Sequence, residues 1–134
     1  MLGDSIRPTL IARELNVKLA RVMERNVLEV FGQPDSRLRA IAIGELYTED
    51  CTLFEQGKHF VGHNAISAKA ERILRQGRGS GPRSTIPAQV IDDVGRVVWK
   101  LALPGTPAIL TCIDIAVFQR GRIRDLYMFP DMPA

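Results

Sequence analysis

Two carboxyl groups stand where the sequence is otherwise apolar, and their types and positions could support acid–base chemistry. Asp114 lies inside the run LTCIDIAVF at 110–118, and Glu55 ends the run CTLFE at 51–55. A carboxylate in an apolar strand is costly unless it is paired, hydrogen-bonded or neutral. Asp114 is therefore either a pocket carboxyl or a buried one that neighbouring hydroxyl or backbone groups satisfy. Glu55 is either a catalytic carboxylate or an ordinary acid at the edge of a hairpin.

Two such groups in unlike surroundings can divide the work of a proton transfer. One carboxyl stays protonated and donates a hydrogen bond, while the other stays ionised and acts as the base. Alternation along the strand places Asp114 on the same face as Cys112, Ala116 and Phe118. That face is predicted to enclose a pocket.

Aromatic and histidine side chains are the candidates for lining such a pocket. They are Tyr47, His63, Trp99, Tyr127 and Phe129. The alternative for the aromatic residues is core packing or a dimer face, and the alternative for the histidine is exposure or helix capping. An apolar outer sheet face built from Trp99, Ile113, Ile115 and Tyr127 would favour association with another chain.

Metal and thiol chemistry find little support in the sequence. His59 and His63 are four residues apart but flank a turn and lack a third ligand, so no metal site is expected. Cys51 and Cys112 lie in apolar runs without metal-ligand spacing and are predicted to be buried reduced thiols. A disulfide between them stays open as an alternative. No cofactor is expected.

Composition limits the class of protein and its partners. The chain has 134 residues, 46% of them hydrophobic and 25% charged, which suits one domain over the whole of 1–134 with a sizeable core. A net charge of +3 with few aromatics near the basic residues gives no footprint for nucleic acid. Residues 1–9 (MLGDSIRPT) lack the apolar core of a secretory signal, and no run of eighteen apolar residues occurs. We expect a cytoplasmic protein that binds neither nucleic acid nor membrane.

Three helices are predicted from the three-to-four spacing of apolar residues. The first spans residues 10–31 and ends at Gly32 and Pro34. Asp35 or Ser36 caps the second, which carries Leu38, Ile41, Leu46 and Tyr47. The third runs from about residue 64 to 76.

Period-two patterns separated by turn residues predict six strands. They cover residues 51–55, 59–61, 85–92, 96–103, 109–119 and 122–129. Strands joined by short turns pair antiparallel, and helices on one face bury the apolar side of the sheet. The predicted fold class is α+β, with three helices packed on a strongly curved mixed, mostly antiparallel, cone-shaped sheet in the order ααββαββββ.

This order and the run LYTEDCTLFEQGKHFVGHNAI at 46–66 resemble the SnoaL-like branch of the nuclear-transport-factor-2-like superfamily. In that branch a helix ends in an aromatic residue, and an acidic turn, a hairpin and a glycine then lead into the third helix. The matching residues are Tyr47, Asp50, Gly62, Ala65 and Ile66. The run 113–123, followed by Tyr127, Phe129 and Asp131, resembles the closing hairpin of the family.

The resemblance implies ketosteroid isomerases, polyketide cyclases, epoxide hydrolases, dehydratases and non-catalytic modules as relatives, and fold alone does not choose among them. Glu55 matches the place of the isomerase base, and Asp114 matches the carboxylic acid that donates a hydrogen bond to the enolate oxygen. Asp114 also matches the single acid–base aspartate of the cyclases. Where the isomerases have a first-helix tyrosine, this chain offers only Met23, Asn26, Val27 or Val30.

The resulting expectation is a homodimeric SnoaL-like protein that holds a small apolar, carbonyl-bearing molecule. It would act as an isomerase or cyclase through Asp114 and Glu55. The alternative is a non-catalytic dimerising or ligand-holding module of the same fold.

Overall fold

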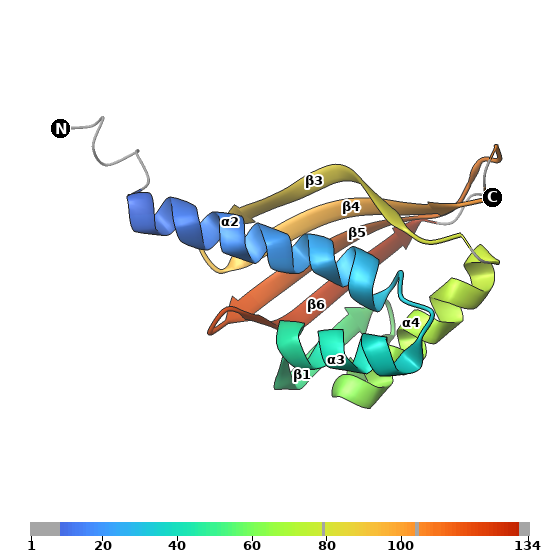
Figure 1. Cartoon of the computed structure of the whole chain (residues 1–134), viewed down its shortest axis with the longest axis horizontal. Helices are drawn as coiled ribbons and strands as arrows, with labels where there is room; N and C mark the ends of the chain where they lie inside the picture. Colours follow the sequence, from blue (N-terminus) through green and yellow to red (C-terminus); the bar gives the residue numbers. More distant parts are fainter. Residues whose placement is uncertain (1–8, 79, 104, 132–134) are drawn as a thin grey trace.

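The computed structural model describes residues 9–78, 80–103 and 105–131, and the expectation about a secretory signal falls largely on residues 1–8, outside this part. Three helices and six strands follow one another in the predicted order (Figure 1). In these ranges no helix has the length and apolar character needed to cross a membrane.

The first helical segment contains a change of helix type. α2 (Leu10–Arg25) begins at Thr9, whose hydroxyl accepts a hydrogen bond from the Ala12 amide at 3.1 Å. It continues as a π-helical turn, η1 (Asn26–Val30), in which the Phe31 amide donates to the Asn26 carbonyl. The predicted helix over 10–31 is confirmed, but the π turn was not predicted. Such turns often occur at functional sites.

The second helix buries a different face from the predicted one. α3 (Ser36–Leu46) is capped by Asp35, as expected. Leu38 and Ile41, however, are 53% and 60% exposed, whereas Arg39 is buried. Arg39 donates hydrogen bonds to Ser67 and Glu71 of α4 (His63–Gly77) and so ties the two helices together. The prediction was therefore wrong for Leu38 and Ile41, in whose place Arg39 is buried with fixed partners, whereas Leu46 and Tyr47 are buried as expected.

The six strands form one sheet in the order β2-β1-β6-β5-β4-β3. All neighbours pair antiparallel except β1 and β6, which are parallel, so the predicted mixed sheet is confirmed. The bounds are β1 (Tyr47–Glu55), β2 (Lys58–Val61), β3 (Arg83–Ile91), β4 (Val94–Ala102), β5 (Ala108–Gln119) and β6 (Arg122–Asp131). β1 thus begins at Tyr47, earlier than predicted, with a register shift between Tyr47 and Thr52.

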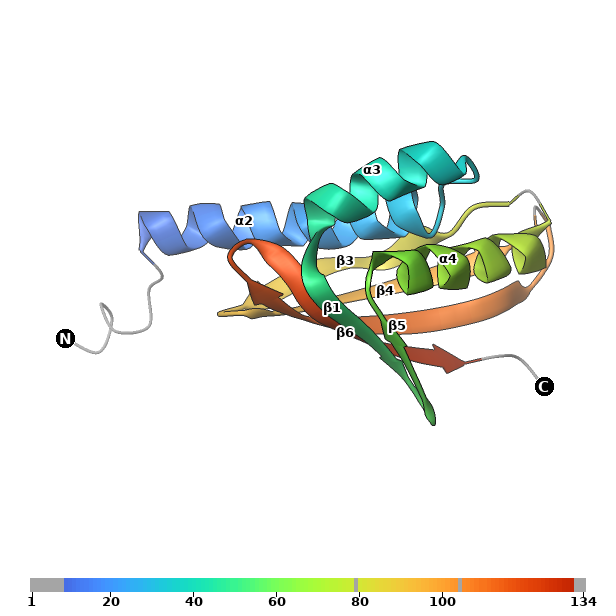
Figure 2. The same ribbon diagram turned by 90° about the horizontal axis from the view of Figure 1, so that it is seen from below.

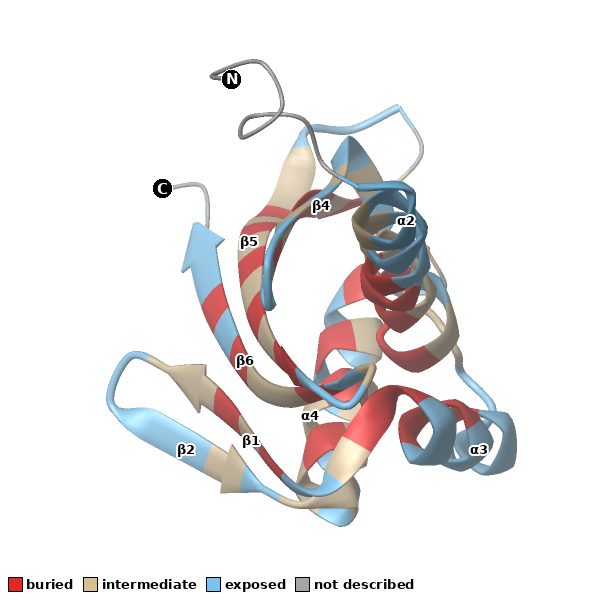
Figure 3. Ribbon diagram, turned by 90° about the vertical axis from the view of Figure 1, so that its left-hand side faces the viewer, coloured by how far each residue is buried: buried red, intermediate tan, exposed pale blue. Residues whose placement is uncertain are grey.

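The sheet curls around the helices, which occupy its concave side (Figures 2 and 3). Residues of the central strands alternate between a buried inner face and a more exposed outer face, as in β5. The core joins this inner face to buried residues of all three helices. The inner face is therefore where any enclosed site must lie.

Gly95 shows how tightly this inner face is packed. A Cβ atom there would lie 2.8 Å from Phe118 Cε2 and 3.2 Å from Met23 Cγ. We expect Gly95→Ala to lower the free energy of unfolding by about 1–3 kcal/mol through overpacking. Gly44, inside α3, has nothing within 4 Å of its Cβ position. Gly44→Ala should instead stabilise the chain by up to about 1 kcal/mol, because alanine favours the helix. Urea denaturation measures both, and equal stability of the two variants would contradict this packing.

Candidate functional site

Asp114 lies on the inner face of β5 and is completely buried. Its cross-strand neighbours are Val97 on β4 and Met128 on β6, which are also buried. Cys112 and Ala116, two residues away on either side, share its face and its burial. The predicted inward position of Asp114 is therefore confirmed.

Two donors hold the Asp114 carboxyl group. The indole Nε1–H of Trp99 donates to Oδ2 at 3.0 Å, and the thiol of Cys112 donates to Oδ1 at 3.3 Å. Trp99 is one strand away on β4, where its register partner is Cys112. Among the described residues each carboxyl oxygen thus has one side-chain donor, whereas a carboxylate can accept about four hydrogen bonds.

Burial raises the pKa of Asp114 to about 7, and the hydrogen bonds from Trp99 and Cys112 only partly oppose this rise. At neutral pH the group is thus divided between the acid and the carboxylate. A carboxyl in that state can both give and take a proton under physiological conditions.

A second polar pair lies beside it in the core. The Tyr47 hydroxyl donates to Oδ1 of Asn26 at 2.6 Å, and both residues are buried. Burial raises the pKa of Tyr47, and the nearby charge of Asp114 raises it further, so the phenol stays neutral. The amide nitrogen Nδ2 of Asn26 is buried and has no hydrogen-bond partner among the described residues. Asn26 is the first residue of the π turn, so this unpaired amide donor lies where the first helix changes from α to π.

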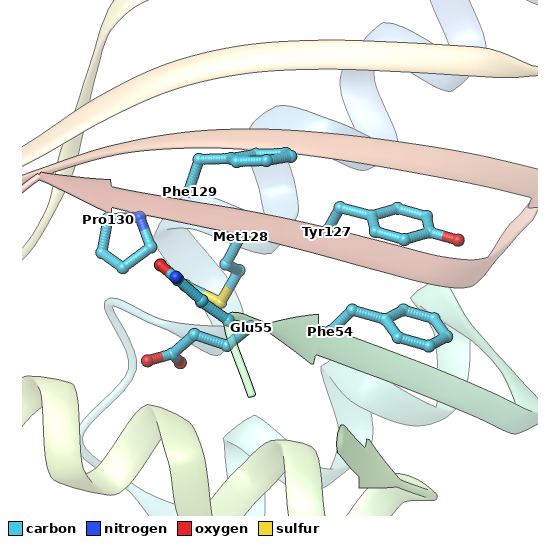
Figure 4. A pocket seen from close by; sticks show the side chains of 7 residues that line it. Phe54, Glu55, Tyr127, Met128, Phe129 and Pro130 are labelled. Atoms are coloured by element: carbon cyan, nitrogen blue, oxygen red, sulfur yellow. The ribbon is translucent and has the colours of Figure 1, made fainter. Parts of the chain in front are cut away.

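Two adjoining pockets open near this polar core, and Figure 4 shows the outer of the two. The inner pocket, of about 100 Å³, lies between α4 and the ends of β5 and β6 and is lined by Glu55, Lys69, Ile73, Gln76, Leu110, Met128 and Pro130. The outer notch, of about 550 Å³, is lined by Phe54, Glu55, Gln56, Tyr127, Met128, Phe129 and Pro130. Glu55, Met128 and Pro130 line both pockets, so they form the boundary between them.

Asp114 lines neither pocket. Its register partner on β6, Met128, does line the inner pocket, and so does Pro130, the register partner of Cys112, whose thiol donates to Asp114. The apolar pocket predicted around Asp114 therefore stops one residue pair short of it. Methionine is flexible, so a change of its rotamer is the least costly way to extend the pocket inward.

Glu55 faces inward with Cys51 and Leu53, as predicted, but it is not a free base. Its carboxylate forms an ion pair with Lys69 of α4 at 2.5 Å. The two side chains are only 18% and 17% exposed, so the pair stands at the rim of the inner pocket. The structure thus places both predicted carboxyl groups on the inner face of the sheet. Asp114 is buried in the core, whereas Glu55 is paired with Lys69 at the rim of the inner pocket.

The other predicted site residues are divided between the two faces of the sheet. Tyr127 and Phe129 line the outer notch, where Tyr127 stacks on Phe54 with ring centroids 4.6 Å apart. Trp99 is fully buried beside Asp114 and lines neither of these two pockets, so the alternative that placed it on an outer apolar face is wrong. His63 is the first residue of α4, and its Nε2 lies 2.9 Å from the carbonyl oxygen of Thr48 on β1. It lines neither the inner pocket nor the outer notch.

The two thiols are free and buried, as predicted. Burial raises the pKa of Cys51 to about 11 and that of Cys112 still further, so neither is a reactive thiolate at neutral pH. Within residues 9–78, 80–103 and 105–131, no three His, Cys, Asp or Glu side chains are grouped as metal ligands.

Solved structures share this arrangement of a curled sheet around three helices. An Agrobacterium tumefaciens protein described as a candidate isomerase of the SnoaL-like family superposes with a TM-score of 0.72 at 17% identity, covering 88% of this chain and 98% of that one. The chain has the SnoaL-like fold. An NTF2-like protein of unknown function from Mesorhizobium loti gives a TM-score of 0.65 at 19% identity, covering 87% of this chain and 93% of that one. The predicted fold relationship is thereby confirmed.

The SnoaL-like fold does not by itself determine a function. A de novo designed protein with a curved sheet matches this chain with a TM-score of 0.69 at 15% identity, covering 86% of each chain. No family model and no curated protein matches the sequence. The activity must therefore be argued from the residues of this chain.

Proposed function

We propose that this SnoaL-like chain binds a small apolar, carbonyl-bearing molecule and moves a proton on it with Asp114, without a metal or organic cofactor. The observation that carries the proposal is a fully buried carboxyl group with a pKa of about 7. It lies one residue pair behind a pocket whose walls are mainly apolar. A buried carboxyl poised near neutrality is a candidate for acid–base work.

In this proton transfer Asp114 is the base, and Asn26 is the donor that stabilises the enolate. The ionised Asp114 takes a proton from the carbon next to the carbonyl group, which leaves an enolate and a neutral carboxyl. The same carboxyl returns the proton to a carbon of the enolate. The amide N–H of Asn26, held by Tyr47, is the donor available to stabilise the enolate oxygen, in place of the tyrosine missing from the first helix.

The ligand would enter through the inner pocket and displace Met128. Leu110, Ile73 and Pro130 supply apolar walls, while the Glu55–Lys69 pair supplies a polar rim. A volume of about 100 Å³ is smaller than a typical ligand site, so binding requires the pocket to enlarge toward Asp114. Glu55 is then a rim residue rather than the base.

Hydrogen–deuterium exchange tests the proposal even while the product is unidentified. Cyclic and polycyclic ketones and enones are incubated with the protein in deuterium oxide, and NMR follows loss of the proton next to the carbonyl group. We expect the wild type to accelerate exchange, with a rate that rises with pH and levels off above about pH 7, as Asp114 ionises. Asp114→Asn should lower the rate about 100- to 10,000-fold.

Asp92→Asn provides the matched control for loss of a carboxyl group. Asp92 is exposed at the turn between β3 and β4, and asparagine tolerates its positive φ of 52°. This variant should leave the exchange rate unchanged. An Asp114→Asn variant as active as the wild type would exclude Asp114 as the base.

A non-catalytic ligand-holding module is the second candidate function. It is favoured by the close packing around Asp114, which lines neither adjoining pocket. A ketone that raises the melting temperature but shows no accelerated exchange would support this candidate over catalysis.

A further inference from the structure

Positive charge gathers at the rim of the inner pocket, around the ring of Phe60. The ammonium nitrogen of Lys69 lies 5.5 Å from the centroid of that ring, and the guanidinium carbon of Arg72 lies 5.4 Å from it. The two cations are three residues apart on α4, so they are neighbours on one face of the helix. Lys69 also lines the inner pocket. The rim therefore presents two cations over one aromatic ring beside the pocket.

The hairpin of β1 and β2 adds a third cation to this rim. The register places Phe60 opposite Leu53 and Lys58 opposite Glu55. Residues opposite each other in an antiparallel pair point to the same side of the sheet, as do residues two apart along a strand. Leu53 is buried on the inner face, so Lys58 and Phe60 lie on the same side of the hairpin as Glu55, toward α4.

Acidic groups do not balance these three cations. Glu55 forms an ion pair with Lys69, but no ion pair in the described part of the chain involves either of the other two cations. Glu71, the acid of α4, is already paired with Arg39. The rim thus keeps an excess of positive charge next to a cavity with mainly apolar walls.

We propose that the ligand of the inner pocket carries a carboxylate, which binds to Lys69 and Arg72 at the rim while its apolar, carbonyl-bearing part enters the pocket. This inference rests on the function proposed above and narrows its substrate class to apolar keto acids. The planar guanidinium of Arg72 fits a carboxylate with two parallel hydrogen bonds. An ammonium group has three N–H donors, so Lys69 keeps donors that its pairing with Glu55 does not use.

The charge of the rim distinguishes an acid from the corresponding neutral or basic ligand. A carboxylate meets one negative charge, that of Glu55, and three positive ones, so its net interaction is favourable. A neutral ester gains no ion pair. An amine would be repelled by Arg72 and Lys58, and such like-charge contacts exclude the wrong ligand.

Matched pairs of acids and esters test this assignment. Cyclohexanones that carry an acetate, propionate or butyrate side chain are each compared with their own methyl ester, and isothermal titration calorimetry measures the dissociation constants. We expect the best acid to bind the wild type at least about tenfold more tightly than its ester, with a preference that falls as salt is raised. Arg72→Gln should reduce the preference to about threefold or less and leave the binding of the ester unchanged.

Two further variants separate the rim from the net charge of the chain. Arg21→Gln removes the same charge from an exposed position in the middle of α2 and should leave the preference unchanged. Glu55→Gln removes the negative charge that competes for Lys69, so it should tighten binding of the acid by about threefold or more without affecting the ester. Circular dichroism verifies that each variant is folded.

Equal binding of acid and ester, or no binding of either, would overturn the inference, and so would an equal loss of preference in Arg21→Gln and Arg72→Gln. Binding needs no turnover and is also measured in Asp114→Asn, so this result is distinct from the fate of the proposed catalysis. Accelerated exchange with equal affinity for acid and ester would remove the role of the rim but leave that of Asp114. Selective binding of the acid without accelerated exchange would do the reverse.

Discussion

The free energy of unfolding of the wild type should fall by about 4 kcal/mol between pH 4 and pH 8 because of Asp114 alone. The pKa of this group rises from 3.8 to about 7 on folding, so in the intervening range the unfolded chain has lost a proton that the folded chain keeps. The contribution of Asp114 to stability is therefore full at acid pH and is lost as the pH rises toward 7. Since small domains have only about 5–15 kcal/mol of stability, the effect is large.

Asp114→Asn isolates this contribution from that of other titrating groups. Asparagine keeps an acceptor for the Trp99 indole but cannot ionise, so the pH dependence assigned to Asp114 should disappear. At pH 8 the variant should equal or exceed the wild type in stability, whereas at pH 4 it should be the less stable of the two. Urea denaturation at each pH measures the difference. Parallel pH profiles for the two proteins would show that Asp114 titrates normally.

Trp99→Phe should destabilise the chain by about 3 kcal/mol at pH 8 and by clearly less at pH 5. The indole N–H is the donor to Oδ2, and a hydrogen bond to a charged group is worth about 1.5–3 kcal/mol against about 1 kcal/mol for a neutral one. Loss of part of a fully buried ring adds a further, pH-independent cost. Because the Trp99 bond lowers the pKa of Asp114, its removal should raise that pKa further.

The same substitution in the Asp114→Asn background provides the control. The cost of Trp99→Phe should there be the same at pH 5 and pH 8, since no charge develops next to the indole. If the pH-dependent part of the cost persisted in the double variant, the indole would be interacting with some other titrating group.

The sequence predicted the fold because its strongest signals are periodic. The six strands, the three helices and the inward face of Asp114 all follow from alternation or three-to-four spacing, which report burial directly. The exceptions are local. The π turn at Asn26–Val30 changes no apolar residue in the pattern, so spacing does not reveal it. In α3 the aliphatic Leu38 and Ile41 mimicked a buried stripe that Arg39 occupies through partners on another helix.

The candidate site could be predicted only in part, because its contacts join residues far apart in the sequence. Periodicity placed Glu55 and Asp114 on inner faces but did not show the pairing of Glu55 with Lys69. Trp99 is itself apolar and lies among the apolar residues of β4, so alternation did not decide which side of the sheet it occupies. No sequence pattern marks Asn26, whose amide nitrogen is an unpaired donor in the described part of the core.

Whether an inner face encloses an open pocket depends on how side chains fill it, and the sequence does not encode this in any pattern. Here Cys112 and Met128 fill the space that was expected to be open beside Asp114. The function proposed for this chain therefore depends on the ionisation of one buried carboxyl group and on the movement of one methionine.

The ionisation of Asp114 near neutral pH is tested most directly by NMR. The carbon-13 chemical shift of its carboxyl carbon is followed from pH 3 to pH 9, and the signal is assigned by its absence in Asp114→Asn. We expect a titration midpoint of about 7. A midpoint near the ordinary value of about 4 would mean that the carboxyl is solvated or paired, and it would remove the basis for acid–base chemistry at this site.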